Sequence, residues 1–227
     1  MTTSAAPSHA QRLAFFYREF IGKKIAMALS GVVLFGYVVI HMAGNLQIFA
    51  GPEQINAYAA QLHSSAPLLW GARVVLLVAV GVHIYTGISL SVQARRARPE
   101  GYRKKGQRYP NLPARTMLLS GVVLLAFIVF HLLHLTVGVV HPQFAELRPY
   151  ENMVTGFRTP VVALFYVLSV VLLGAHLFHG AWSMFQSLGI NHPRYTPKLR
   201  AFAAIFAFVL TVGFATVPLA VLFGAVR

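Results

Sequence analysis

Long apolar stretches alternate with short polar connectors along the whole chain. Five of these stretches have about 20 residues or more, the length that a helix needs to cross the ~30 Å hydrocarbon core of a bilayer. They cover approximately residues 25–49, 67–93, 116–140, 160–187 and 201–225. None shows the apolar and polar alternation of a membrane β-barrel strand. The pattern therefore predicts an all-α integral membrane protein, a bundle of five transmembrane helices.

The composition agrees with this prediction. The 227 residues are 57% hydrophobic and 11% charged, whereas an ordinary soluble domain is near 25% charged. A chain of this length predicts one domain, so we expect residues 1–227 to form a single membrane domain. The first 24 residues contain no apolar stretch and do not resemble a signal peptide, so we interpret the first span as uncleaved.

Basic residues are distributed unevenly between the connectors. Fifteen of the 19 Lys and Arg lie in the N-terminal tail, in the connector 94–115 or in the connector after the fourth span. By the positive-inside rule, this predicts a cytoplasmic N-terminus and an outside C-terminus in a multi-pass protein of the inner (cytoplasmic) membrane. In a chain this apolar, the net charge of +14 indicates topology and not a nucleic-acid partner.

The basic connector 94–115 contains two glycines and three prolines, a composition typical of a loop. Its charge has two interpretations. It could only fix the topology and contact anionic lipid, or it could form a docking surface for a cytoplasmic partner protein. Charge alone does not separate the two.

Histidine is the chemically active residue type inside the predicted spans. The spans hold six histidines and no Asp or Glu. Proton relays and cation transporters usually depend on intramembrane carboxylates, so their absence counts against those functions. Neutral imidazole without an ionic partner suits coordination of a metal or of haem iron. The six are His41, His83, His131, His134, His176 and His179.

Two sequence patterns occur twice along the chain. One is Ser-Gly followed after nine residues by His, and the other is His followed after three residues by Gly. The first occurs at Ser30–His41 and Ser120–His131, and the second at His83–Gly87 and His176–Gly180. This spacing indicates that the first two spans are duplicated in the third and fourth. The fifth span contains no histidine, so we expect it to be a packing helix.

Depth in the membrane sorts four of these histidines into two levels. At 1.5 Å per residue, His41 and His131 lie ~25 and ~24 Å from the cytoplasmic edge, and His83 and His176 both lie ~18 Å from it. We call His41 and His131 the outer pair, and His83 and His176 the inner pair. The levels predict two stacked bis-histidine haem sites, each with one iron ligand from each half of the repeat.

Several other residues are candidates around these sites. Gly87 and Gly180 lie one helical turn beyond their histidines, where a missing side chain leaves room for a flat porphyrin. Ser30 lies on nearly the same helix face as His41 and is deep enough to line the inner site, where it is also a candidate quinone contact. His134 and His179 are each alternative ligands, hydrogen-bond partners of a ligand or quinone contacts.

The only charged residue inside a predicted span is Arg73, near the outer level. It could pair with a haem propionate, bind a quinone carbonyl or extend outward to the interface. Four further histidines fall outside the spans, and we expect all of them to be ordinary surface residues. They are His9, His63, His141 and His192.

Taken together, these features resemble the diheme cytochrome b membrane anchor of succinate:quinone oxidoreductases (succinate dehydrogenase or fumarate reductase), in the type with one five-helix polypeptide. The resemblance covers essentially the whole chain, and its motifs are specific jointly although each alone is weak. They are the two Ser-Gly-x9-His patterns, His-Met-Ala-Gly-Asn at His41–Asn45, His-Ile-Tyr-Thr-Gly at His83–Gly87 and the segment His176–Gly189.

The resemblance implies that the chain is the electron-transfer and quinone-reactive subunit of respiratory complex II. It implies two b haems, held by the outer pair and by the inner pair, with His176 favoured over His179 because Gly180 follows four residues later. It also implies a flavoprotein subunit with covalent FAD that carries the succinate or fumarate site, and an iron–sulfur subunit. Membrane quinone, often menaquinone, is the substrate that such an anchor reduces or oxidises. The resemblance also allows a trimer as a higher-order assembly of the complex.

The absence of cysteine agrees with a complex in which the iron–sulfur clusters lie on another subunit. A chain without cysteine cannot hold disulfides, zinc–thiolate sites or thiolate-ligated iron–sulfur clusters. It also cannot attach haem covalently through a C-x-x-C-H motif. Any iron–sulfur cluster of such a complex must therefore lie on another chain.

Two other classes of protein remain open. The cytochrome b subunit of a formate dehydrogenase or hydrogenase also holds two b haems through membrane histidines, although two matched helix pairs plus a fifth helix fit the succinate family better. A histidine-lined transporter of divalent metals should show a wet path with carboxylates, which the spans lack. Such a transporter would be colourless.

Overall fold

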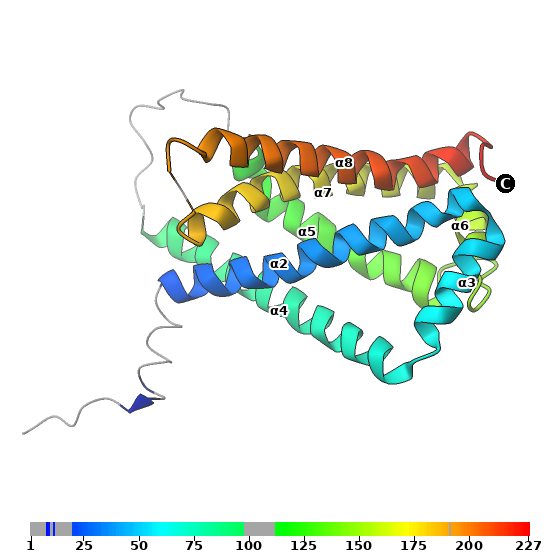
Figure 1. Cartoon of the computed structure of the whole chain (residues 1–227), viewed down its shortest axis with the longest axis horizontal. Coiled ribbons are helices and arrows are strands. Elements are labelled where there is room, and N and C mark those ends of the chain that lie inside the picture. Colours follow the sequence, from blue (N-terminus) through cyan, green and yellow to red (C-terminus); the bar gives the residue numbers. More distant parts are fainter. Residues whose placement is uncertain (1–7, 10, 12–19, 98–111, 191) are drawn as a thin grey trace, which may run out of the picture.

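The computed structural model describes residues 8, 9, 11, 20–97, 112–190 and 192–227. The regular structure of these residues is entirely helical. Five helices are long and apolar enough to cross a membrane, so the chain is a multi-pass membrane protein (Figure 1). They are α2 (Phe20–Asn45), α4 (Ala66–Arg96), α5 (Leu112–Leu132), α7 (Pro160–Ser187) and α8 (Thr196–Leu222).

The sequence did not predict four shorter elements. Two of them, α3 (Pro52–His63) and α6 (Pro149–Phe157), lie with the C-terminus at the end of the bundle opposite the start of α2 (Figure 1). The 3-10 helix η1 (Leu46–Ala50) extends α2, and the π-helix η2 (Leu133–Val137) extends α5. Glycine ends η2, because Gly138 adopts a φ of 85° and an added Cβ there would collide with the Phe144 ring.

Some helix boundaries differ from the predicted spans. The predicted connector 94–115 is too long at both ends, because its first three residues belong to α4 and its last four to α5. Helix α2 begins at Phe20 and α8 at Thr196, each five residues earlier than predicted. Helices in membrane proteins continue past the hydrocarbon core when polar or basic side chains can reach the interface, which an apolar count does not register. Residues 98–111 lie outside the described part of the chain.

Proline begins most of these helices. Its fixed φ and missing N–H suit the first turn, where backbone N–H groups have no partner inside the helix. The first or second helical position is proline in α3, α4, α6, α7 and α8. Since proline stops a preceding helix as well, these residues set where the connectors end.

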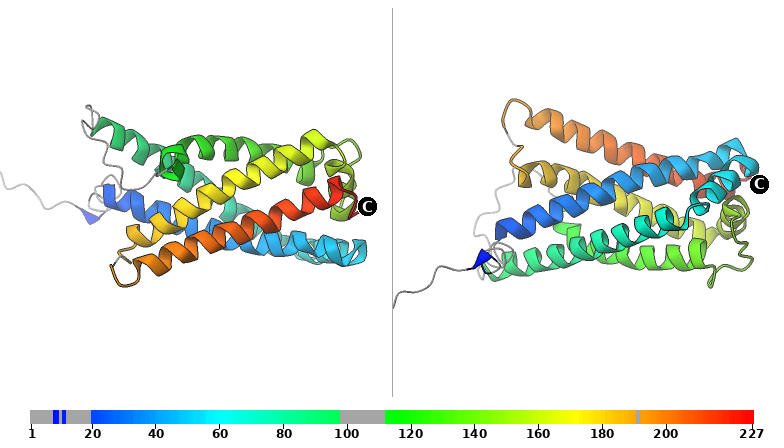
Figure 2. Two further views of the ribbon diagram at one scale, coloured as in Figure 1. Left: turned by 90° about the horizontal axis from the view of Figure 1, so that it is seen from above. Right: turned by 60° about the horizontal axis from the view of Figure 1, so that its bottom comes forward.

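The bundle consists of two helix pairs and a fifth helix. α2 packs mainly on α4, and α5 packs on α7. The most extensive contact is between α7 and α8, which lie side by side in both views of Figure 2. Small residues allow close approach, since Gly174 in α7 faces Thr211 in α8, and Gly213 in α8 faces Met42 in α2. This arrangement agrees with the predicted duplication of spans one and two in spans three and four.

The largest buried apolar cluster lies where α3, α6 and η1 meet α7, α8 and the C-terminus. Its residues include Ile48, Met153, Phe157, Tyr166 and Val221. By contrast, many large apolar side chains of α4, such as Leu77 and Val78, are exposed. Exposed apolar residues on a membrane-spanning helix face lipid, so the tightly packed part of the fold is at one end.

The described basic residues gather at the other end of the bundle, which we call the basic end. Lys23 and Lys24 begin α2, Arg95 and Arg96 end α4, and the connector before α8 carries Arg194. Four basic residues belong to the α6 end or to the first turns of α4, namely Arg73, Arg148, Arg158 and Arg227. The uneven distribution expected from the sequence therefore holds for the described residues.

Candidate functional site

The outer pair brings together two helices from different halves of the chain. His41 lies in α2 and His131 lies in α5. Their ring centroids are 5.8 Å apart and the ring planes meet at 81°. Two residues separated by 90 positions thus face each other, as the sequence predicted.

The inner pair repeats this arrangement between the second helices of the two halves. His83 in α4 and His176 in α7 have ring centroids 6.2 Å apart, with an angle of 58° between the rings. Two imidazoles bound on opposite sides of one metal, at metal–nitrogen distances of ~2.0 Å plus a ring radius of about 1.1 Å, have centroids roughly 6 Å apart. Both pairs therefore have the spacing that suits two axial ligands of one iron.

A serine holds each imidazole of the inner pair. The Ser30 hydroxyl in α2 lies 3.4 Å from Nδ1 of His83, and the Ser120 hydroxyl in α5 lies 3.3 Å from Nδ1 of His176. Each hydroxyl also donates to a carbonyl of its own helix, Ser30 to Met27 at 3.1 Å and Ser120 to Met117 at 3.0 Å. The contact is thus made twice, once in each half of the repeat.

These contacts favour one tautomer of each inner-pair imidazole. A serine hydroxyl has one proton, and here it is given to a backbone carbonyl. With the hydroxyl directed to the carbonyl, its oxygen can only accept from the imidazole, and this arrangement puts the ring proton of His83 and of His176 on Nδ1. The lone pair of Nε2 remains on the other side of each ring, which is the tautomer that a metal-ligating histidine requires.

The outer pair has different surroundings. His41 stacks on Tyr37 and contacts Phe214 of α8, with ring centroids 5.3 and 5.9 Å away. Asn45 places its side-chain nitrogen 3.4 Å from Nε2 of His41. Nδ1 of His131 is buried and has no hydrogen-bond partner among the described residues. An unpaired buried nitrogen is costly, so the outer pair is less fully hydrogen-bonded than the inner pair.

Glycines border the inner pair on two sides. A Cβ added to Gly31 or Gly121 would lie 3.6 or 3.9 Å from Cε1 of His83 or His176, which is ordinary contact. A Cβ added to Gly87 or Gly180 would meet nothing within 4 Å. The two glycines predicted to make room for a flat ring therefore have open space beside them.

Among the described residues, His134 has no ring contact with either member of the outer pair. It is 2% exposed, and its Nδ1 lies 3.0 Å from the hydroxyl of Tyr166. Its ring stacks on Phe130 at 5.4 Å. Residues three apart share a face in an α-helix, but His134 lies in the π-helix η2, whose i→i+5 bonding widens the turn. His134 is therefore a packed and hydrogen-bonded core residue.

Among the described residues, neither His179 nor Arg73 makes a ring contact or a hydrogen bond with the four paired histidines. His179 is half-buried in α7, and in the described part of the chain it has no ring contact with His83 and no hydrogen bond. The Arg73 guanidinium lies over the ring of Trp70, 4.9 Å from its centroid. Trp70 is 60% exposed on the apolar surface of α4, so this stacking suits a residue at the membrane interface.

One surface histidine was predicted wrongly. His141 is buried, donates from Nε2 to the Asn152 carbonyl at 2.9 Å, and accepts at Nδ1 from the Gln143 N–H at 3.1 Å. The error has a physical reason, because α6 covers the connector in which His141 lies. The other three, His9, His63 and His192, are exposed as expected.

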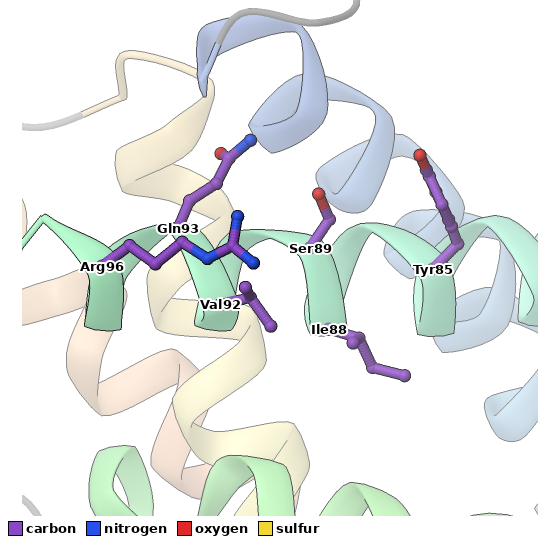
Figure 3. A pocket seen from close by; sticks show the side chains of 6 residues that line it. All are labelled: Tyr85, Ile88, Ser89, Val92, Gln93 and Arg96. Carbon is purple, nitrogen blue, oxygen red and sulfur yellow. The ribbon is translucent and has the colours of Figure 1, made fainter.

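A pocket of about 350 Å³ lies on the half of α4 nearer the basic end, apart from the histidine pairs. Figure 3 shows Gln93 and Ser89 on one side of the helix and Ile88 and Val92 on the other. Tyr85 and Arg96 complete its lining. It contains none of the predicted site residues.

Sequence reasoning missed several residues of the sites. The sequence identified Ser120 only as part of a motif, although its match to Ser30 in the repeat was a signal that both serines contact an inner-pair histidine. Asn45 belongs to a motif as well, but its contact with His41 was not predicted. Nothing in the sequence pointed to Phe214, because it lies on the helix without histidine. A scan of protein-family models and searches of curated proteins and of solved structures found no match to this chain.

Proposed function

We propose that this chain is a diheme cytochrome b that transfers electrons across a membrane. The observation that carries the proposal is the repeated geometry of two histidine pairs with ring centroids 5.8 and 6.2 Å apart, each pair joining the two halves of the bundle. The serine contacts add to it, because they leave Nε2 of His83 and His176 free to bind a metal.

His41 and His131 would hold one haem iron, and His83 and His176 the other. A haem iron held by two histidines would supply one-electron transfer. The chain's own contribution is to fix the ligand geometry and the tautomer and to exclude water through the apolar helices around each pair. The largest buried apolar cluster, which includes Tyr166, packs the α6 end of the bundle.

Haem suits these residues better than a free metal ion does. Among the described residues, no group of three or more His, Cys, Asp or Glu lies close enough together to hold a metal ion. Protein sites for zinc and similar ions usually supply three or four ligands. A haem iron takes four ligands from the porphyrin and needs only two from the protein, which is what each pair offers.

The more specific proposal is the membrane anchor subunit of a succinate:quinone oxidoreductase. It rests on the joint occurrence of the two Ser-Gly-x9-His motifs and the two His-x3-Gly motifs in one five-helix chain. In this proposal the chain lies in the cytoplasmic membrane with the basic end inward. There it would meet an iron–sulfur subunit, next to a flavoprotein subunit with FAD, and would exchange electrons with quinone, expected to be menaquinone.

The test begins with purification of the full chain together with whatever subunits accompany it. We expect a b-type reduced-minus-oxidised spectrum and two haems per chain by the pyridine haemochrome assay. Succinate should reduce these haems in the purified complex. A flavoprotein and an iron–sulfur protein should co-purify, and the flavin should remain attached after denaturation.

The outcomes separate the competing functions. Haems that respond to formate or hydrogen, and not to succinate, would replace the succinate proposal with another membrane redox complex. A colourless preparation of intact chain would overturn the diheme proposal altogether and would favour a histidine-lined metal transporter. Replacement of His41, His83, His131 or His176 by Ala should each remove one haem, while the chain continues to accumulate in the membrane.

A further inference from the structure

The two serine contacts of the inner pair have a consequence beyond ligand identity. Ser30 and His83 lie on different helices, as do Ser120 and His176. Each serine therefore joins the two helices of its own half through one imidazole. The outer pair has no serine contact of this kind, since His41 meets Asn45 of its own helix at Nε2 and Nδ1 of His131 has no partner among the described residues.

We propose that Ser30 and Ser120 are positioning residues that fix the inner-pair imidazoles and set the redox potential of the iron bound there. This inference rests on the proposed diheme function and deepens it. Its observations are the two Oγ–Nδ1 distances of 3.4 and 3.3 Å and the carbonyl bonds that orient both hydroxyls.

The physical argument concerns the polarity of the hydrogen-bond chain. In each half, the imidazole Nδ1–H donates to the serine oxygen, and the serine hydroxyl donates to a carbonyl. A hydroxyl that donates becomes a better acceptor, because bonds in a chain polarise one another. A stronger bond at Nδ1 raises the basicity of Nε2. A more basic ligand stabilises the ferric over the ferrous state, so the serines lower the potential of the inner iron.

The same contacts restrict rotation of the rings. Without its serine, an imidazole loses the hydrogen bond that fixes its rotation about the Cβ–Cγ bond. Each serine is itself buried, Ser30 with 7% and Ser120 with 4% of its surface exposed. Water therefore does not readily replace the missing hydroxyl in an alanine variant.

The experiment uses the purified complex with Ser30→Ala, Ser120→Ala and the double substitution. The matched control is Ser169→Ala, because Ser169 is also a buried serine, in α7, but among the described residues its hydroxyl donates only to the Phe165 carbonyl, at 2.8 Å. Ser30→Thr and Ser120→Thr retain a hydroxyl and serve as rescue variants. The measurements are haem content, midpoint potentials from a spectroelectrochemical titration and the low-spin ferric EPR spectrum.

We expect the alanine variants to raise the potential of one haem and to change one of two low-spin EPR signals. The affected haem should be the one that His83→Ala removes. The control should match the parent protein, and the threonine variants should return toward it. Loss of the inner haem alone, with normal chain abundance and an unaffected control, would also support the positioning role.

Three results would overturn the inference, and only the last of them would also overturn the proposed diheme function. If the parent complex contains two b haems but the alanine variants leave both potentials and both EPR signals unchanged, the serines do not position the ligands and the diheme function stands. The same conclusion follows if Ser169→Ala produces an equal shift. If the parent complex contains no b haem, the proposed function fails, and this inference fails with it.

Discussion

The hydroxyl of Tyr166 in α7 pairs with Nδ1 of His134 in η2 at 3.0 Å, inside the most tightly packed end of the bundle. Tyr166 is also a ring neighbour of His131, with centroids 5.9 Å apart. Two histidines three residues apart therefore have different environments. His131 faces its partner across the bundle and has an unpaired nitrogen, whereas His134 is enclosed and hydrogen-bonded.

This difference predicts opposite results for two neighbouring substitutions. His131→Ala should reduce the haem content from two to one per chain, because it removes half of the outer pair. His134→Ala should retain both haems but destabilise the protein by about 1–3 kcal/mol, since the buried Tyr166 hydroxyl loses its partner. Pyridine haemochrome content and thermal melting in detergent measure the two effects. Loss of a haem in His134→Ala with no loss in His131→Ala would show that the ligand is assigned wrongly.

The serine contact gives a similar prediction for α7. Ser120 binds Nδ1 of His176 and makes no contact of this kind with His179. His176→Ala should therefore remove the inner haem, and His179→Ala should keep two haems per chain with unchanged absorption. The comparison needs equal chain abundance, measured by immunoblot of the membranes. The assignment is reversed if only His179→Ala loses a haem.

The space beside Gly87 can be tested by filling it. Gly87→Leu places a large side chain where a Cβ meets nothing within 4 Å, so the chain should still fold. If that space belongs to the inner haem, its occupancy should fall several-fold while the outer haem remains. The matched control is Gly81→Leu, at an exposed position of the same helix with equally open space around its Cβ. Equal haem loss in both variants would show that the effect is not local.

Close packing of α7 on α8 gives a prediction about stability alone. A Cβ at Gly174 would collide with the Thr211 hydroxyl, so Gly174→Ala should force the helices apart at a cost of about 1–3 kcal/mol. Gly36→Ala is the control, because its Cβ meets nothing within 4 Å and alanine favours a helix. Thermal melting of the purified complex should fall for the first variant only. Equal melting temperatures would contradict the packing argument.

Acidic pH should weaken the α6 end of the bundle. Burial acts to raise the pKa of Glu151, but hydrogen bonds from Asn56 and Arg148 and the Arg148 charge outweigh it and lower the pKa below its ordinary value. A lowered folded-state pKa stabilises the fold above the unfolded pKa of ~4.3, and this contribution is lost as the pH falls through the folded value.

The expected size of this pH effect is small, because the Glu151 side chain is 41% exposed and solvent screens its ion pair with Arg148. Melting temperatures measured between about pH 6 and pH 3 should fall more steeply for the parent protein than for Glu151→Gln. Gln retains a hydrogen-bonding side chain but does not titrate. Parallel curves for the two proteins would contradict the role assigned to the carboxylate.

How far the sequence predicts this structure depends on the period and length of its patterns. The five spans follow from length and hydrophobicity, and the pairs His41–His131 and His83–His176 follow from the duplicated spacing. Local backbone geometry does not follow in the same way. The π-helix η2, in which His134 lies, does not follow from any residue pattern in the sequence.

Contacts between segments far apart in the chain were also not predictable from the sequence. His141 lies in a connector that looks exposed in the sequence, and only the docking of α6 buries it. Phe214 contacts His41 from α8, the helix that was expected only to pack against the others because it contains no histidine. Ser30 was expected near the inner level because helical spacing determines depth, but its partner His83 depends on how α2 and α4 cross, which spacing alone does not give.

Because each pair takes one histidine from each half, the order of synthesis constrains when the protein can mature. After α2 and α4 have left the ribosome, the membrane holds only one side of both pairs. The outer pair is complete once α5 has entered, and the inner pair only when α7 has folded back against the first half. A nascent chain that stops before α7 can therefore form one pair and not the other, so the outer site should mature first and the inner site last.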